Sequence, residues 1–362
     1  MSSHKRFQQG ESGRASPSAA FSLIELLISL AVLSVLVVLA ASLIGAIQDV
    51  WKRSSARTEQ FRSARQALET ISSRLSQATL NPYWVVQTNA SGVPVRYERQ
   101  SDLRFLAGPA ISTIGSTVGS GTIVPGSGVF FQAPTGYFTN NSASSLNAAI
   151  NTWGYYVEYG PDSGPDSSRP PFISTSIIPT KNRFRLVEFI DPSDGLTIFS
   201  KTSGESAYNG KDWFTDPLAK TGNRRVLADN IVAFVALPRL SSVEDSSVGQ
   251  VDLSPQFSYD STSTNAVPIT DSRNKLVQHI IRHQLPPIVD IAVVAIDEQS
   301  ARRITWGSSP PVFGTNLFQN ATMMEIDLEK LRANIDAQGL SARVFRTSVP
   351  ISAARWSTEQ KN

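Results

Sequence analysis

The most prominent hydrophobic pattern in this chain is an uninterrupted apolar stretch near its N-terminus. From Phe21 to Ile47 the sequence runs through 27 residues in which Glu25 is the only ionisable side chain. A helix rises about 1.5 Å per residue, so this stretch would extend roughly 40 Å and exceed the hydrocarbon core of a bilayer, which is about 30 Å thick. The pattern predicts one membrane-spanning helix over residues 21–47.

After Ile47 the pattern becomes amphipathic. Apolar residues recur at steps of three and four, which places them on one face of a helix. The stripe consists of Phe61, Ala64, Leu68, Ile71, Leu75 and Ala78. No proline lies between Phe21 and Leu80, and Asn81 with Pro82 supplies a stop signal. We expect one helix over residues 21–80, whose amphipathic part, residues 48–80, packs on the chain's own globular domain rather than forming an independent coiled coil.

The rest of the chain, residues 81–362, alternates short β-rich runs with segments rich in turn residues. The predicted strands are 83–87, 95–98, 103–106, 129–132, 154–159, 183–190, 196–199, 230–237, 288–296 and 343–349. Long loops are expected at 108–128, 160–171 and 241–268. In the strand 183–190 the apolar and charged positions suggest one buried face and one wet face. The element order predicts an α+β fold, a long N-terminal helix followed by a mainly antiparallel sheet domain.

Composition excludes several classes of protein. The chain has 362 residues, 41% of them hydrophobic, and no cysteine, which removes disulfide frameworks, cysteine nucleophiles and Cys-ligated zinc. Lysine and arginine number 33 against 30 acidic residues, so a net charge of +3 gives no reason to expect nucleic acid as a partner. The sequence has no phosphate-binding P-loop and no Gly-x-Ser-x-Gly elbow. We therefore expect a protein that is not an enzyme.

Glu25 requires an explanation, because a carboxylate within an apolar span costs about 3 kcal/mol on insertion scales. One interpretation is that its side chain reaches the headgroup layer. The other is that a cation lies at the same depth in the membrane. Residues 1–20 form a polar stretch where a leader would lie. If this leader were cut between Ala20 and Phe21, the new α-amino group of Phe21 would supply that cation.

These residues carry a resemblance. The segment Ala20-Phe21-Ser22-Leu23-Ile24-Glu25, followed by an apolar helix, resembles the prepilin cleavage and methylation motif of type IV pilins and type II secretion pseudopilins. The resemblance implies a pilin-like α+β architecture and cleavage of the Ala20–Phe21 bond by prepilin peptidase. It also implies N-methylation of Phe21 and a role for Glu25 in assembly with other pilin-like subunits. The family usually has Gly before the cut, where this chain has Ala20.

Within that family the globular part looks most like the large J-type minor pseudopilins. The chain also resembles the cassette C proteins, which are encoded in four-gene sets in Verrucomicrobia. The resemblance implies a single-pass protein of the inner membrane, with residues 81–362 in the periplasm and a filament as the final state. The basic residues that follow the span outnumber those before it, which argues against this orientation, but long domains translocate largely regardless of flanking charge.

Three alternatives remain open at this stage. The apolar run could be a secretory signal cut after Ala40, although it is longer than such signals. The chain could be an extracytoplasmic binding protein or adhesin that keeps residues 1–20 as an uncleaved anchor. A tethered enzyme would need a cluster of acid and base groups in the fold.

The metal-binding potential of the sequence is small. His279 and His283 are four residues apart, which on a helix would place both imidazoles on one face. Acidic loops at Asp162, Asp166 and 191–194 offer oxygen ligands of the kind that Ca²⁺ takes, but without the spacing of an EF-hand. We expect the histidines to be surface or packing residues and the acidic loops to be solvated turns. No cofactor is predicted, and Ca²⁺ is retained as the alternative.

Overall fold

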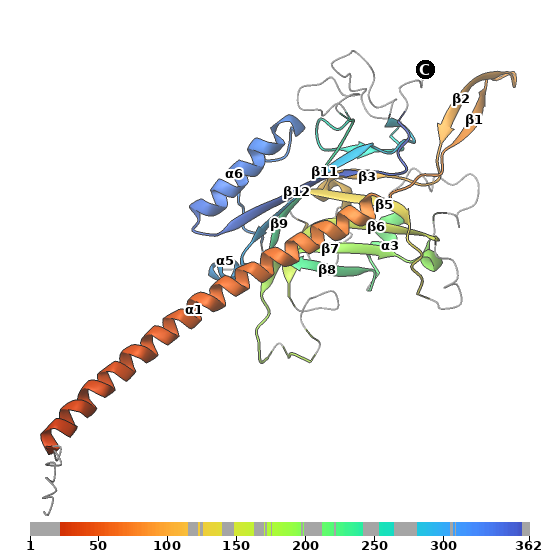
Figure 1. Cartoon of the computed structure of the whole chain (residues 1–362). Coiled ribbons are helices and arrows are strands. Elements are labelled where there is room, and N and C mark those ends of the chain that lie inside the picture. The colour runs from red at the N-terminus through yellow and green to blue at the C-terminus, as the bar shows by residue number, and fades with distance from the viewer. Residues whose placement is uncertain are drawn as a thin grey trace, which may run out of the picture. The chain divides into compact units, whose positions relative to one another are not determined.

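The computed structural model describes residues 22–114, 122–123, 126–139, 148–162, 170, 172–174, 176–196, 198, 212–220, 222–241, 253–263, 281–304, 307 and 309–356. Contacts within the chain divide it into two units, Met1–Ser54 and Ser55–Asn362. All the β-strands of the described residues lie in the second unit. The α+β class predicted from the sequence is confirmed: a long N-terminal helix precedes a mainly antiparallel sheet domain (Figure 1).

Helix α1 extends from Leu23 to Leu75 and ends earlier than the predicted boundary at residue 80. The reason lies in the hydrogen bonds of the residues that follow. The amide of Ala78 donates to the carbonyl of Leu75 over 3.0 Å, which tightens the last turn, and the amide of Thr79 donates to the carbonyl of Gln132 over 2.9 Å. Because Thr79 is bonded to a strand of the domain, the chain leaves the helix before the Asn81-Pro82 stop signal.

The amphipathic stripe packs on the chain's own domain, as the spacing predicted. Five of its six members are buried in the main hydrophobic core: Ala64, Leu68, Ile71, Leu75 and Ala78. Phe61 is half-buried, and its ring centroid lies 6.1 Å from that of Phe345. The part of α1 within the second unit is therefore a structural element of the domain.

The strands form three antiparallel sheets (Figure 1). Strands β1 (Tyr83–Thr88) and β2 (Pro94–Gln100) pair only with each other. The seven-stranded sheet has the order β10-β3-β5-β6-β7-β8, with β4 paired to β6. Its strands are β3 (Leu106–Pro109), β4 (Thr122–Ile123), β5 (Ser127–Pro134), β6 (Ile150–Pro161), β7 (Asn182–Asp191), β8 (Arg224–Asp229) and β10 (Tyr259–Asp260). The three-stranded sheet has the order β12-β11-β9, with β9 (Ile231–Arg239), β11 (Ile288–Ile296) and β12 (Ala342–Pro350).

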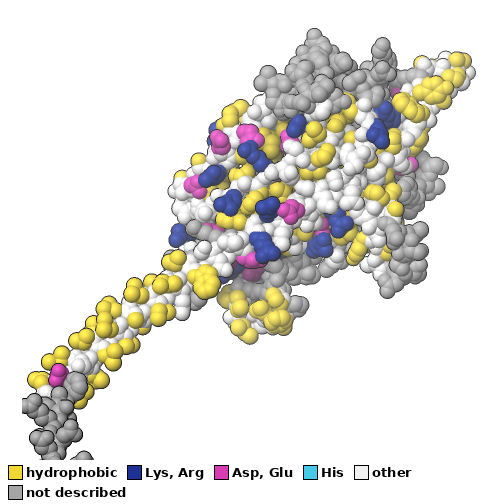
Figure 2. All heavy atoms as spheres, viewed as in Figure 1, with side chains coloured by type: hydrophobic (Ala, Val, Ile, Leu, Met, Phe, Trp, Pro, Cys, Tyr) yellow, Lys and Arg dark blue, Asp and Glu magenta, His cyan; other side chains and the backbone are white. Residues whose placement is uncertain are grey.

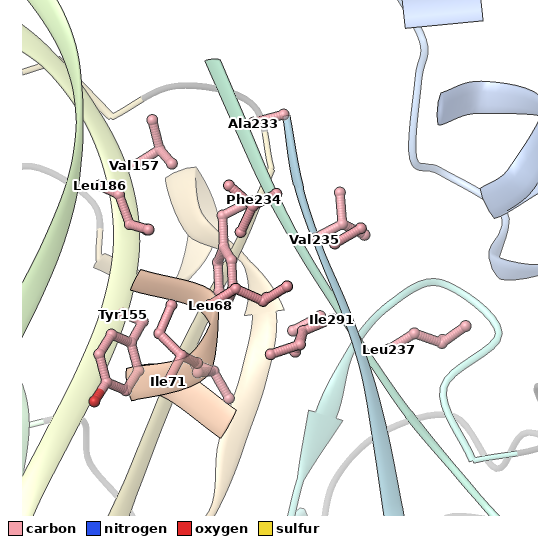
Figure 3. Packing of buried hydrophobic residues seen from close by; sticks show 14 of the residues in the cluster. Leu68, Ile71, Tyr155, Val157, Leu186, Ala233, Phe234, Val235, Leu237 and Ile291 are labelled. Atoms are coloured by element: carbon pink, nitrogen blue, oxygen red, sulfur yellow. The ribbon is translucent and has the colours of Figure 1, made fainter. Parts of the chain in front are cut away.

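The main core lies between α1, the seven-stranded sheet and the three-stranded sheet. Figure 3 shows Leu68 and Ile71 of α1 with Tyr155 of β6 on one side and Phe234 of β9 and Ile291 of β11 on the other. All five side chains are buried. The helix stripe therefore joins the two sheets through one continuous apolar interior.

The remaining helices cover other faces of the sheets. Helices α2 (Ala110–Ile114) and α3 (Asp212–Leu218) contribute to a second core, which contains Phe130, Tyr156, Val187, Phe189 and Phe214. Phe130 stacks on Phe214 with ring centroids 4.1 Å apart. Helix α6 (Met324–Ala337) buries Leu328, Leu331 and Ile335 in the main core. The short elements η2 (Ser193–Gly195), α5 (Glu298–Arg303) and η3 (Ala321–Met323) complete the described part.

Because the seven-stranded sheet has a core on each side, the predicted wet face of strand 183–190 was wrong. Along β7, Phe184 and Leu186 belong to the main core and Val187 and Phe189 to the second core. The charged residues between them are also buried. One of them, Arg185, donates to Glu158 of β6 over 2.6 Å, so the pair compensates its own burial.

Eight of the predicted strands coincide with observed ones, and two do not. Residues 103–105 precede β3 instead of forming a strand, because the amides of Leu103 and Arg104 donate to the side chains of Asn81 and Gln132. Leu196 and Ile198 form no strand, and residues 197 and 199 lie outside the described residues. Parts of the expected loops are ordered elements: α2 and β4 lie within 108–128, and β10 lies within 241–268.

Candidate functional site

The start of α1 positions the residue that the sequence singled out. The carbonyl of Ser22 accepts the amides of Glu25 at 3.0 Å and Leu26 at 3.2 Å, so Glu25 lies in the first turn. Its side chain is exposed. A carboxylate in the first turn interacts favourably with the positive end of the helix dipole. This local term does not replace a counter-ion in an apolar medium.

The apolar half of α1 offers a continuous hydrophobic surface. Residues Leu23–Trp51 form a helical segment of 29 residues that is long and apolar enough to cross a membrane, and none of its most apolar stretch is buried in the structure. Figure 2 shows hydrophobic side chains covering this segment. A cleavable export signal would satisfy the same criterion of length and composition. The identity of the segment therefore depends on the residues at its beginning.

The hydroxyl groups within the apolar segment are satisfied by the helix itself. The Oγ atoms of Ser29, Ser34 and Ser42 donate to the carbonyls of Glu25, Ala31 and Leu39, over 2.7 to 2.8 Å. Such bonds remove the penalty for a free donor in hydrocarbon. Among the side chains between residues 23 and 47, Glu25 is then the polar group that still lacks compensation.

No cation within the described residues forms an ion pair with Glu25. Ala20 and Phe21, the two residues of the predicted cleavage site, lie outside the described residues, as does the rest of the predicted leader. The cleavage, the methylation and the pairing of Glu25 therefore stay predictions. What the structure adds is the setting, an exposed acid in the first turn of an exposed apolar helix.

The structure describes one of the two histidines that the sequence offered as metal ligands. His279 lies outside the described residues, and His283 is a half-buried residue with a left-handed backbone, φ 53°. Burial and the neighbouring Arg282 lower the pKa of His283 to about 4. Within the described part of the chain, no group of three or more His, Asp or Glu side chains could hold a metal ion.

The described aspartates of the acidic loops have hydrogen-bond partners within the protein. Asp162 accepts the amide of Lys181 at 2.9 Å, and Asp194 accepts the amide of Thr139 at 3.1 Å. Asp166 lies outside the described residues. The expectation of a solvated turn was wrong for Asp191, because its side chain is buried. Burial raises the pKa of its carboxyl group to about 6. Metal binding at these loops remains an untested alternative.

One exposed apolar surface was missed in the sequence. Strands β1 and β2 were both predicted, but the side chains that alternate along them leave Trp84, Val86, Val95 and Tyr97 exposed. The short interval between the two predicted runs, residues 88–94, indicates a hairpin. Only the structure shows that no third strand of the described residues pairs with it.

Comparison with known proteins supports the interpretation of the N-terminus. Residues 16–41 match the family model described as the prokaryotic N-terminal methylation motif. The match includes Ala20, Phe21 and Glu25 and most of the apolar helix. No curated protein and no solved structure matches the chain. The motif supports a pilin- or pseudopilin-type, prepilin-like subunit with a transmembrane helix and a methylated N-terminus. Subunits with this motif are structural proteins.

Proposed function

We propose that this chain is a prepilin that becomes a non-enzymatic subunit of a type IV pilus or of a pilus-like type II secretion filament. Prepilin peptidase removes residues 1–20 at the Ala20–Phe21 bond, and the new amine of Phe21 is methylated. The observation that carries the proposal is Glu25, an exposed acid in the first turn of an apolar helix, within the matched motif.

The assembly force in this proposal is burial of the apolar surface of α1. In the bilayer this surface contacts lipid, and in a filament it contacts the same surface of neighbouring subunits. The carboxylate of Glu25 pairs there with the Phe21 amine of a neighbour. An unpaired charge in such a low-dielectric bundle costs several kcal/mol, so the pair selects one register between adjacent helices.

The topology proposed for the membrane-bound state is a single pass through the inner membrane, with residues 21–47 in the bilayer. Residues 48–80 then belong to the periplasmic side, together with the domain of residues 81–362. Burial of the α1 stripe supports this division, because Leu68, Ile71 and Leu75 lie in the core of the domain and are not available to lipid.

The size of the domain favours a minor subunit over a densely repeated one. A domain of this size on every subunit would crowd a helical shaft, so we place the chain at the tip, by analogy with large minor pseudopilins. This step rests on size and analogy.

The decisive experiment is to identify the first residue of the mature chain. Full-length protein is isolated from membrane fractions, and its N-terminal peptide is examined by mass spectrometry. We expect the chain to begin at Phe21 with a methylated amine. A chain that begins at Met1 would instead be an uncleaved membrane-anchored binding protein, and a chain that begins near residue 41 would be a secreted one.

A further inference from the structure

The β1–β2 hairpin is a separate arm attached to the body of the domain. Its two strands pair in antiparallel register, from Tyr83 opposite Gln100 to Val86 opposite Tyr97, and Figure 1 shows them extending away from the rest of the domain. The side chain of Asn81 closes the base, because its Oδ1 accepts the amides of Asp102 at 2.9 Å and Leu103 at 3.1 Å. The arm is therefore held at a fixed point.

The two faces of the arm differ in polarity. One face, which we call the polar face, carries Gln87 and Glu98 beside Tyr83 and Val85. Gln87 and Glu98 hydrogen-bond to each other over 3.2 Å, and Glu98 also pairs with Arg282 of the body at 3.5 Å. The opposite face, which we call the open face, consists of Trp84, Val86, Val95, Tyr97 and Arg99. Trp84 is 59% exposed, Val95 65% and Tyr97 67%. Within the described part of the chain, nothing covers the open face, and Figure 2 shows hydrophobic side chains on this arm.

Arg99 gives the open face its charge. Its guanidinium carbon lies 5.3 Å from the ring centroid of Trp84, and burial lowers the pKa of the guanidinium. No carboxylate in the described part of the chain pairs with it. The one acid of the arm, Glu98, lies on the polar face and is already bonded. Among the described residues, the open face therefore has neither an apolar cover nor an anion.

The two edges of the arm are not equivalent. Strand β2 begins with Pro94, which has no amide hydrogen, and carries an extra residue, Val95, where the register shifts. Proline and bulges are features that protect an edge from pairing. Strand β1 has neither over its six residues. Because two-stranded hairpins are marginal in water and gain stability from a third strand, β1 provides the edge to which one can be added.

We propose that β1 binds an extended segment of another protein by strand addition. The segment alternates apolar residues, which lie beside Trp84 and Val86 on the open face, and carries one carboxylate next to Trp84, where the guanidinium carbon of Arg99 lies 5.3 Å from the ring centroid. The arm of a second copy does not fit, because its one acid, Glu98, lies on the polar face and is already bonded. A lipid surface would cover the apolar side chains but would form no backbone ladder with the edge of β1. The proposal is independent of N-terminal processing.

The test uses the full-length chain in detergent and a labelled ten-residue peptide of alternating valine and threonine with one central glutamate. Binding is measured by fluorescence anisotropy. We expect this peptide to bind at least tenfold more tightly than the same peptide with a central lysine. Arg99→Glu should reverse the preference, whereas Arg332→Glu, on the exposed side of α6, should leave it unchanged. A preference that Arg99→Glu does not alter would overturn the proposal.

Strand addition itself is tested with two further peptides, N-methylated at the odd or at the even positions. Only one edge of the peptide faces β1, so one of them should lose binding and the other should retain it. Equal behaviour of the two would overturn the proposal. Tyr97→Ser reduces the apolar area of the open face without a change of charge. It should weaken binding of the glutamate peptide and of the lysine peptide by the same factor.

The competing occupants have their own results. Vesicles of phosphatidylglycerol that bind the arm and displace the peptide would overturn the proposal in favour of a lipid surface. Dimers in sedimentation that Arg99→Glu abolishes would overturn it in favour of a second copy. Mature protein that begins at Met1 would contradict the filament function and leave this test intact, so the two failures are distinguishable.

Discussion

Ile71 offers the sharpest test of how α1 is attached to the domain. Its side chain is fully buried, and Figure 3 shows it in the core between the two sheets. Ile71→Ala removes three buried carbons, each worth about 0.8 kcal/mol of transfer free energy, which amounts to about 2.4 kcal/mol. The cavity that remains raises the expected loss in the free energy of unfolding to about 3–4 kcal/mol.

The assay is urea unfolding of the full-length chain in mild detergent, followed by tryptophan fluorescence. With a slope of about 3 kcal/mol per molar urea, the expected loss lowers the midpoint by about 1 M. Gln66→Ala, at an exposed position of the same helix, is the matched control and should change the midpoint very little. If Ile71→Ala behaved like Gln66→Ala, the stripe of α1 would not be part of the domain core, and the reasoning from burial would fail.

Three further predictions concern the N-terminus and the interior. Glu25→Val should leave membrane insertion intact and reduce co-purification of partner subunits, because an apolar residue cannot pair with an amine; unchanged co-purification would contradict this. Ala20→Trp should retain the leader, which a gel would show as a chain larger by about 2 kDa, and a chain of unaltered size would count against cleavage at this bond. Burial raises the pKa of Asp191 to about 6 from 3.8. The folded chain thus holds this proton more tightly than the unfolded chain, and stability from this group falls as pH rises from about 4 to 6. Asp191→Asn should remove that part of the decline, which urea midpoints at both ends of the range would measure.

The sequence predicted the elements whose patterns are local. The apolar run and the stripe specified α1 and its buried side before any contact was known. The strand at Ile288–Ile296 was predicted with its observed bounds, because an apolar run of that length between turn residues leaves little ambiguity. The motif around Glu25 was also readable, since an acid in an apolar stretch is rare.

Other features depended on neighbours that a sequence does not show. The charged residues of β7 suggested a solvent face, whereas Glu158 and Arg185 pair inside the protein. Strand β8 was missed because its arginines obscure the pattern, and its pairing with β7 defines it. Helix α6 was missed although Leu328, Leu331 and Ile335 recur at helical steps. The open face of the arm could not be recognised, because exposure depends on which strands are absent from its side.

The closure at Asn81 has an evolutionary consequence. The chain leaves the body and returns to it at a single point, where one amide side chain bridges residues 81 and 101–103. An arm whose two ends are adjacent can be lengthened, exchanged or deleted without disturbing the core of the domain. Related chains can therefore acquire new recognition specificities by replacing this arm while they keep the same N-terminal helix and the same core.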